Sequence, residues 1–283
     1  MPDQLDLFAE PAGELPDRLG HAEITSAPTR SILTKASGFM ADYDYTINPY
    51  SGCSYGCTYC YAAFFARTQK RRDSWGEWVE VKDNALAVLR RMRTDLSGKT
   101  VYMSSVTDPY QPIERRLGLV RSLLQELAPR GVRLVVQTRS PVVTRDIDVL
   151  REFSAVRVNM TITTDSEDVR RAFEPHCPAN SKRLDAIAEV AAAGIPAAIT
   201  MTPLLPVADV AGFADQLLAT GVKRFVVQPF HADRGKFVAG TREAALAIER
   251  ELGWDDTAYR QAVTELRQRL PELREGKEGF APE

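Results

Sequence analysis

Short apolar strand segments alternate with helical segments along most of this 283-residue chain, and that alternation limits the folds that it can adopt. It implies parallel pairing of the strands, right-handed crossovers and a sheet covered by helices. No Gly-x-Gly-x-x-Gly turn follows a predicted strand, which argues against an open doubly wound sheet. The sequence therefore predicts an α/β fold with a partial (β/α)6 barrel of the TIM type. Strands are predicted at residues 43–49, 100–105, 132–137, 156–163, 196–202 and 224–228, and helices at 58–67, from 83 onward, through 119–127, and at 142–153, 182–193 and 208–220.

Polar side chains recur where the predicted strands end. In a barrel of parallel strands, the carboxyl ends meet on the face where active sites are built. The functional face is therefore predicted there. The polar residues concerned are Ser104, Ser105, Thr138, Thr161, Thr163, Thr202 and Gln228.

The chain is predicted to consist of a flexible acidic tail (1–30), the barrel (31–248) and a helical extension (249–283). The tail mixes Pro, Gly and acidic residues without periodicity. The N-terminus lacks a basic flank before an apolar run, and no run of about 18 apolar residues occurs, so neither a signal peptide nor a membrane span is expected. The expected location is the cytoplasm.

Three of the four cysteines fall within eight residues, at Cys53, Cys57 and Cys60, in a C-x3-C-x2-C spacing. Thiolates select zinc or iron-sulfur clusters, and a structural zinc site takes four ligands. Three neighbouring thiolates suit a 4Fe-4S cluster in which one iron stays open. Gly52 and Gly56 let the loop wrap closely around such a group.

Two alternatives stay open from the residues alone. One is a zinc site completed by His176 or Cys177, and the other is a redox pair formed by Cys57 and Cys60. Cys177 lies far from these three cysteines in the sequence, and we predict that it is a loop or packing residue.

The cysteine spacing, the aromatic Tyr59 before the third cysteine, and the position after the first barrel strand resemble the radical SAM superfamily. The resemblance implies a 4Fe-4S cluster whose open iron binds S-adenosylmethionine (SAM). It also implies an electron donor such as flavodoxin or ferredoxin, and reductive cleavage of SAM to a 5'-deoxyadenosyl radical. In such enzymes the cofactor carries the difficult chemistry and the protein positions it.

Further motifs resemble the spore photoproduct lyase-like subgroup of that superfamily over residues 30–240. That resemblance places Ser105, Thr107 and Asp108 near the methionine end of SAM, and Thr161 and Thr163 near its ribose. A β-turn alone would also explain Asp108-Pro109. The motifs are Asn48-Pro-Tyr-x-Gly-Cys53, Thr107-Asp-Pro-Tyr-Gln-Pro112-x-Glu114, Thr161-Ile-Thr-Thr164, and Phe173-Glu-Pro175 with Arg183.

The same resemblance gives Tyr59 and Tyr61 places near the reaction centre, although both could simply pack under a cluster. It also brings a departure. The lyase returns a hydrogen atom from a cysteine just before its fourth-strand polar pair, and Asn159 stands at that position here. Asparagine cannot donate a hydrogen atom in this way, so the lyase reaction on thymine dimers does not carry over with the motifs.

Basic residues are concentrated in the middle of the chain, although its net charge is only −2. Residues 67–139 hold fifteen Lys and Arg against eight Asp and Glu. This density suits a polyanion such as DNA, and it equally suits a set of solvated helix faces.

The segment from Gln4 to Phe8, Gln-Leu-Asp-Leu-Phe, resembles the short peptide by which bacterial repair factors dock on the sliding clamp. A flexible tail can present such a peptide to an apolar pocket. The alternative is that Leu7 and Phe8 pack on the barrel.

Three functions are therefore compared. The leading one is radical SAM chemistry on a DNA lesion or modified base. The second keeps that chemistry on RNA, protein or a small molecule, because substrate choice depends on loops. The third is a non-catalytic iron-sulfur or zinc module recruited to the replisome.

Overall fold

An eight-stranded sheet forms the framework of the computed structural model, which describes residues 15–230 and 242–282. The strand order is β12-β11-β10-β9-β8-β7-β4-β3. All neighbouring strands are parallel except β3 and β4. The strands are β3 (Leu33–Lys35), β4 (Tyr45–Ile47), β7 (Thr100–Met103), β8 (Arg133–Thr138), β9 (Ala155–Thr161), β10 (Ala197–Met201), β11 (Arg224–Val227) and β12 (Glu272–Glu275).

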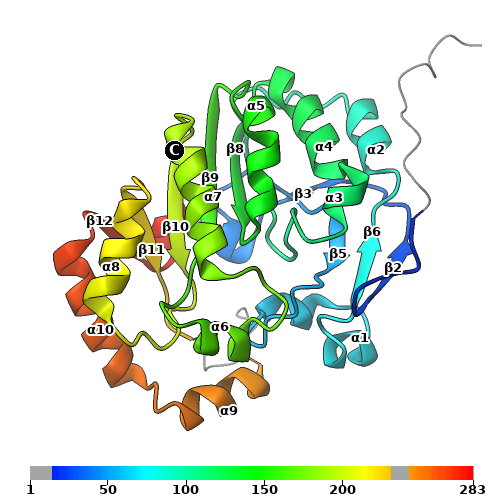
Figure 1. Cartoon of the computed structure of the whole chain (residues 1–283). Helices are drawn as coiled ribbons and strands as arrows, with labels where there is room; N and C mark the ends of the chain where they lie inside the picture. The colour runs from blue at the N-terminus through cyan, green and yellow to red at the C-terminus, as the bar shows by residue number, and fades with distance from the viewer. Residues whose placement is uncertain (1–14, 231–241, 283) are drawn as a thin grey trace, which may run out of the picture.

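Helices cover the outer face of this sheet (Figure 1). The spacing of apolar residues explains how they pack: in α4, Val120, Leu123, Leu124 and Leu127 are buried along one stripe. The α-helices are α1 (Gln69–Asp73), α2 (Ala85–Arg91), α3 (Glu114–Leu117), α4 (Leu119–Leu127), α5 (Ile147–Leu150), α6 (Glu167–Phe173), α7 (Asn180–Ala192), α8 (Val210–Ala219), α9 (Glu243–Glu251) and α10 (Asp256–Arg269).

The predicted partial α/β barrel is confirmed. All six predicted strands are present, as β4, β7, β8, β9, β10 and β11, and they lie side by side in parallel. The sheet has β3 and β12 as its two ends among the described residues. Strands that are buried on both faces need near-continuous apolar runs, and β7 and β11 are buried at every position.

The C-terminal extension differs from the prediction. It is not purely helical, because β12 adds a further parallel strand next to β11. The 3-10 helix η5 (Gly276–Phe280) then buries Phe280 against Tyr43 and Tyr102. The Tyr43 hydroxyl donates to the Phe280 carbonyl at 2.5 Å, so the end of the chain packs against the barrel interior. The boundary predicted at residue 248 falls inside α9.

The tail predicted over residues 1–30 is wrong for its second half. β1 (Arg18–Leu19) and β2 (Ala22–Ser26) belong to a second sheet with the order β1-β2-β6-β5. Its other strands are β5 (Tyr50–Gly52) and β6 (Trp78–Val81), and the group lies at the right of Figure 1. Ala22 and Ile24 are buried with the two-residue period of a strand. The strand has only five residues, so this pattern does not stand out in the sequence.

Two further predictions about local structure were wrong. The helix predicted at 58–67 is a shorter 3-10 helix, η2 (Tyr61–Phe65). Asp83 does not cap the following helix; Asn84 stands at that position, and its side chain instead pairs with the backbone of Thr29, with N···O distances of 2.8 and 3.1 Å. The amide thus fastens the N-terminal segment to the barrel.

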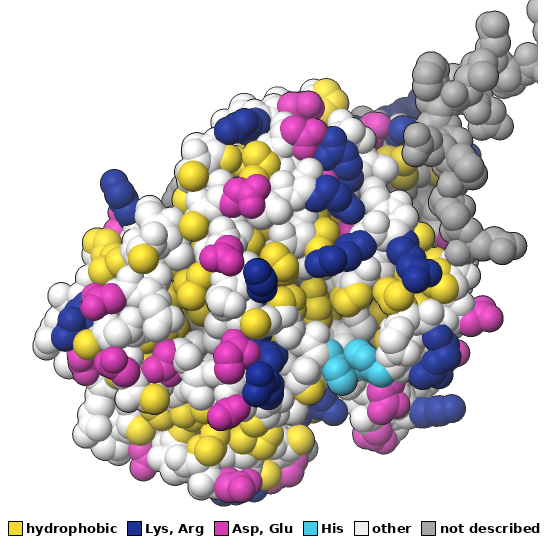
Figure 2. Space-filling view, in the orientation of Figure 1, with side chains coloured by type: hydrophobic (Ala, Val, Ile, Leu, Met, Phe, Trp, Pro, Cys, Tyr) yellow, Lys and Arg dark blue, Asp and Glu magenta, His cyan; other side chains and the backbone are white. Residues whose placement is uncertain are grey.

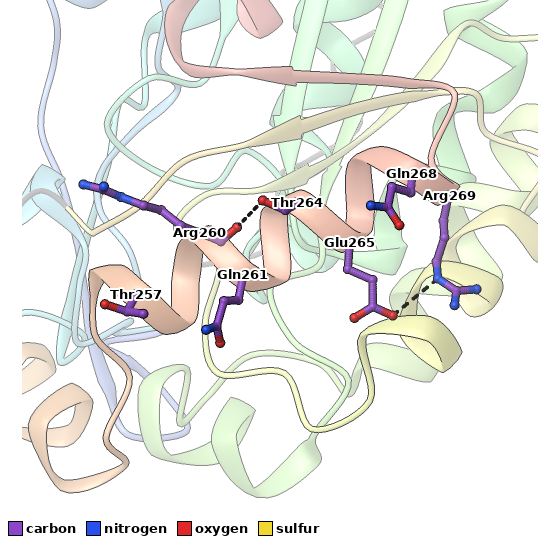
Figure 3. A pocket seen from close by; sticks show the side chains of 7 residues that line it. All are labelled: Thr257, Arg260, Gln261, Thr264, Glu265, Gln268 and Arg269. Atoms are coloured by element: carbon purple, nitrogen blue, oxygen red, sulfur yellow. Dashed lines mark hydrogen bonds and ion pairs between the residues drawn. The ribbon is translucent and has the colours of Figure 1, made fainter.

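The exposed face of α10 carries a shallow depression of about 590 Å³ (Figure 3). It lies on one face of a single helix, and its Glu265 is already paired with Arg269 at 3.5 Å. It has no cysteine or histidine, and we assign it no part in the site. Its lining residues are Thr257, Arg260, Gln261, Thr264, Glu265, Gln268 and Arg269.

Within residues 15–230 and 242–282, none of the helices is both long enough and apolar enough to cross a membrane.

Candidate active site

The cysteine loop begins directly after β5, beyond the carboxyl end of β4. Two glycines are required for its path. Gly52 has φ +76°, and a Cβ there would lie 2.6 Å from the Trp78 ring. Gly56 has φ +60°, and a Cβ there would lie 3.0 Å from the Cα of Gly76. Any side chain at either position would therefore push the loop off its support.

Hydrogen bonds from two other segments of the chain fix the loop backbone. The Thr107 hydroxyl donates to the Gly52 carbonyl at 2.6 Å, and the Ser54 amide donates to Gln111 Oε1 at 3.0 Å. His21 Nε2 lies 2.9 Å from the Ser54 carbonyl. His21 belongs to the β1-β2 turn, so a segment that the sequence predicted to be a tail supports the site.

The three thiols of the loop are largely withdrawn from solvent. Cys53 and Cys57 are buried and Cys60 is partly buried. Burial raises the pKa of Cys53 and of Cys60, because a thiolate is poorly solvated there. A cation faces the remaining thiol, that of Cys57: Arg139 Nη1 lies 2.9 Å from Cys57 Sγ. In the described part of the chain, no group of three His, Cys, Asp or Glu side chains already surrounds a common metal position.

The donor set nevertheless fits a soft metal group. Three thiols on one short, glycine-bent loop supply three ligands of one kind, and Arg139 places a positive charge 2.9 Å from Cys57 Sγ. Three ligands leave a fourth coordination position without a donor from the loop.

Cys177 lies closer to the loop than the sequence suggested. Its Sγ is 3.5 Å from Cys57 Sγ, so the loop that follows α6 does reach the site. Cys177 is a buried loop residue that packs in one apolar cluster with Cys53 and Cys57, as predicted, and the structure adds that this cluster lies at the site itself. Its pKa is raised by burial and by the neighbouring Cys57.

Sequence reasoning missed a buried charge network beneath the thiols. Glu174 is fully buried, 2.6 Å from Arg183 Nη2 and 3.2 Å from Arg139 Nη1. It also accepts hydrogen bonds from the hydroxyls of Tyr59 and Thr163. Burial alone would raise its pKa, but Arg183 and Arg139 hold the pKa at about 2. Glu174 is thus ionised and links the cysteine loop, β8 and α7.

Arg139 could have been found from the sequence. It comes directly after β8, and the carboxyl ends of barrel strands are where functional side chains are expected. Glu174 and Arg183 belong to a motif of the resemblance, but only the fold brings them together.

Asp108 is buried, and both of its carboxylate oxygens accept hydrogen bonds from the protein. It accepts from the Thr138 hydroxyl at 2.7 Å, the Tyr110 amide at 2.9 Å and the Arg139 amide at 2.9 Å. Burial raises its pKa despite these bonds. These contacts tie the loop after β7 to the end of β8, which is a positioning role. Direct contact with a cofactor stays a prediction for Asp108.

Ser105 and Thr107 lie on the same loop after β7. The Ser105 amide donates to Asn48 Oδ1 at 2.9 Å, and the Thr107 hydroxyl reaches the cysteine loop through Gly52. The Thr107 side chain therefore holds the cysteine loop in place, whereas the Ser105 hydroxyl accepts from Asn48 Nδ2 at 3.2 Å.

Thr161 and Thr163 lie at the end of β9 and are buried. Thr161 accepts from Gln137 Nε2 at 2.8 Å, whereas Thr163 donates to Glu174 at 3.0 Å. The structure therefore joins Thr163 to the charge network and leaves Thr161 deeper in the barrel. Asn159 is deeper still on the same strand, and its amide oxygen accepts from Arg157 at 3.0 Å.

The two predicted tyrosines occupy different environments. Tyr59 is buried, and its hydroxyl accepts from Arg139 at 2.8 Å while donating to Glu174. Burial raises its pKa well above the ordinary value. Tyr61 is 48% exposed, and its hydroxyl donates to the Ser105 carbonyl. Tyr59 is part of the network, whereas Tyr61 has a face exposed to solvent.

The fold and this loop define an α/β-barrel protein with three clustered thiols beyond the carboxyl end of its first barrel strand. The chain belongs to the radical SAM superfamily, whose family model matches residues 47–216.

The chain is also similar to uncharacterised relatives and to solved structures. An uncharacterised protein of Methanocaldococcus jannaschii is 37% identical over 162 residues, covering 57% of this chain and 61% of the relative. An uncharacterised protein of Mycobacterium tuberculosis is 31% identical over 228 residues, covering 74% of this chain and 66% of the relative. The chain thus spans less than two thirds of the length of either relative.

The structure of spore photoproduct lyase complexed with dinucleoside spore photoproduct matches with a TM-score of 0.59, covering 89% of this chain and 81% of that one. The identity is 16%, so the likeness is one of fold.

Proposed function

We propose that this protein is a radical SAM enzyme that acts on a nucleic-acid base, with a DNA lesion or modified base as the leading substrate class. The observation that carries the proposal is the set of three thiols on one braced loop, facing Arg139 at the carboxyl edge of the barrel.

Cys53, Cys57 and Cys60 would hold a 4Fe-4S cluster, and the coordination position left without a thiol would take the cofactor. When bound, the cluster supplies the electron that cleaves SAM reductively to a 5'-deoxyadenosyl radical. The reductant would be a small electron carrier such as flavodoxin or ferredoxin.

The chain's own residues would position SAM through charge and hydrogen bonds. Arg139 is a cation suited to a carboxylate, because its planar guanidinium can donate two parallel hydrogen bonds. Thr161 and Thr163 are hydroxyls suited to a ribose. Glu174 and Arg183 hold Arg139 and Tyr59 in place from below.

Two observations support a nucleic-acid substrate. One is the fold shared with spore photoproduct lyase, and the other is the excess of Lys and Arg between residues 67 and 139. Recruitment through Gln4–Phe8 to the sliding clamp is proposed with it; that peptide lies outside the described residues.

The substrate class can be tested by stimulation of SAM cleavage. Reconstituted, reduced protein should form 5'-deoxyadenosine slowly alone, and severalfold faster with ultraviolet-irradiated DNA than with the same DNA left intact. Stimulation by RNA, protein or a small-molecule fraction, with none by DNA, would replace the nucleic-acid lesion by that class.

A further inference from the structure

The segment that follows the cysteine loop exposes two aromatic rings. Residues 61–72, from η2 into α1, are called the aromatic-basic arm. Tyr61 is 48% exposed and Phe65 is 63% exposed. Their rings meet edge to face, with centroids 6.3 Å apart. Large apolar rings on a surface forgo the stabilisation that burial brings, so a pair of them beside a candidate active site calls for a binding partner.

Cations lie next to these rings. Arg67, Lys70 and Arg72 are exposed, and none of them forms an ion pair with a carboxylate in the described part of the chain. Arg71 differs, because it pairs with Glu80 at 3.0 Å and lies over the Trp78 ring. Figure 2 shows Lys and Arg side chains over the region of α1. The arm therefore presents positive charge that no carboxylate among the described residues pairs with.

The arm is fixed to the functional face. Cys60 directly precedes it, and the Tyr61 hydroxyl donates to the carbonyl of Ser105 at the end of β7. At the other end, Arg72 Nε donates to the Ala66 carbonyl at 3.0 Å, and the Thr68 hydroxyl caps α1. The rings and cations are thus held on one short, braced segment beside the thiols.

We propose that the aromatic-basic arm binds an unpaired stretch of nucleic acid, stacking a base on Phe65 and contacting phosphates with Arg67 and Lys70. Exposed aromatic rings beside a row of cations are the combination that binds single strands, because every base has a face that can stack. In a duplex the bases stack on each other, so no base face is free to stack on these rings. The inference rests on the proposed nucleic-acid substrate and assigns it a docking surface.

Fluorescence anisotropy with a labelled 20-nucleotide thymidine strand, as DNA and as the matching RNA, tests the arm on the reconstituted protein. Loss of one stacked base costs about 1–3 kcal/mol, so Phe65→Ala should weaken binding roughly tenfold and Phe65→Trp should restore it. Arg67→Gln with Lys70→Gln should lower the slope of log K against log salt by about 1.4, since each phosphate contact on a single strand contributes about 0.7. Phe65→Ala should leave that slope unchanged.

Matched controls separate the arm from the other basic and aromatic surfaces. Phe39 is 45% exposed and precedes β4, at the opposite end of the strands, so Phe39→Ala should not weaken binding. Arg91→Gln with Arg93→Gln removes two exposed charges from α2 and its following turn, and should not change the salt slope beyond a small screening effect.

Three results would overturn the proposal. They are equal loss in the Phe39 or Arg91/Arg93 controls, equal or tighter binding of a blunt duplex, and no binding of either strand at tens of micromolar. If binding were replaced by retention of an acidic protein partner that depends on the same cations, the arm would be a protein-docking surface instead.

Failure of the arm to bind a strand can be distinguished from failure of the proposed radical SAM function. Substrate-free cleavage of SAM should be the same in Phe65→Ala and wild type, because Phe65 is 63% exposed and its described ring contact is with Tyr61 and not with the charge network. Normal cleavage with no strand binding would reject the arm alone. Absent cleavage with intact strand binding would reject the radical SAM chemistry alone.

Discussion

Replacing Glu174 with glutamine tests whether the buried charge network holds the site together. Glu174 is the shared partner of Arg139 and Arg183, with N···O distances of 3.2 and 2.6 Å. Its side chain and that of Arg183 are fully buried. The substitution keeps the shape but leaves two guanidinium groups without their carboxylate, and uncompensated buried charge costs about 3–5 kcal/mol.

The depressed pKa of Glu174 also reflects the stability that its ionised carboxylate contributes to the network. The ordinary glutamate pKa is about 4.3, and the network holds this one at about 2. That difference corresponds to about 3 kcal/mol of stability, because each unit is worth about 1.4 kcal/mol. A depressed carboxyl pKa contributes fully above the unfolded value and loses its effect as pH falls towards the folded value. The stabilisation should therefore be complete at pH 7 and about half lost near pH 3.

Urea unfolding of the metal-free protein, followed by circular dichroism at pH 7, 5 and 3, measures this effect. Glu174→Gln should lower the free energy of unfolding by about 3–5 kcal/mol at pH 7, and its difference from wild type should shrink as pH falls. Glu265→Gln is the matched control, because Glu265 pairs with Arg269 at 3.5 Å on the exposed face of α10. It should cost less than about 1 kcal/mol. If both variants lost the same stability, or if the Glu174 difference did not depend on pH, the network would not have the role assigned to it.

Three other changes have defined outcomes. Cys177→Ala should retain about four irons per chain by metal analysis, because the three loop thiols remain; loss of iron would make Cys177 a ligand. Asp108→Asn should lower the free energy of unfolding by about 1–3 kcal/mol in urea, because the amide turns a donor towards groups that also donate; unchanged stability would remove its positioning role. Leu7→Ala with Phe8→Ala should abolish binding to the bacterial sliding clamp by surface plasmon resonance and leave SAM cleavage intact; equal binding by the variant would reject the proposed docking peptide.

The barrel was predictable because its signal is local. Apolar strand segments such as 132–137 and 156–163 appear directly in the sequence, and their alternation with helices fixes parallel pairing. The second sheet was not predictable in this way. β1 and β5 are only two and three residues long, and the pairings of β6 with β2 and with β5 join segments far apart in the chain. Such strands depend on tertiary contacts that no local pattern records.

The candidate site likewise has a part that local sequence predicts and a part that depends on the fold. The three loop cysteines could be found from spacing alone, because one short loop carries them. The network of Arg139, Glu174 and Arg183 could not, because its members come from three separate segments. The proximity of Cys177 to Cys57 also depends on the path of a loop 120 residues away in the chain.

Product analysis with single cysteine variants tests the central claim most directly. The protein would be purified without oxygen, reconstituted with iron and sulfide, reduced with dithionite and given SAM. The account predicts about four irons per chain and formation of 5'-deoxyadenosine and methionine, both lost when Cys53, Cys57 or Cys60 is replaced by alanine. Stoichiometric zinc without iron, or no 5'-deoxyadenosine from the iron-loaded wild type, would contradict it.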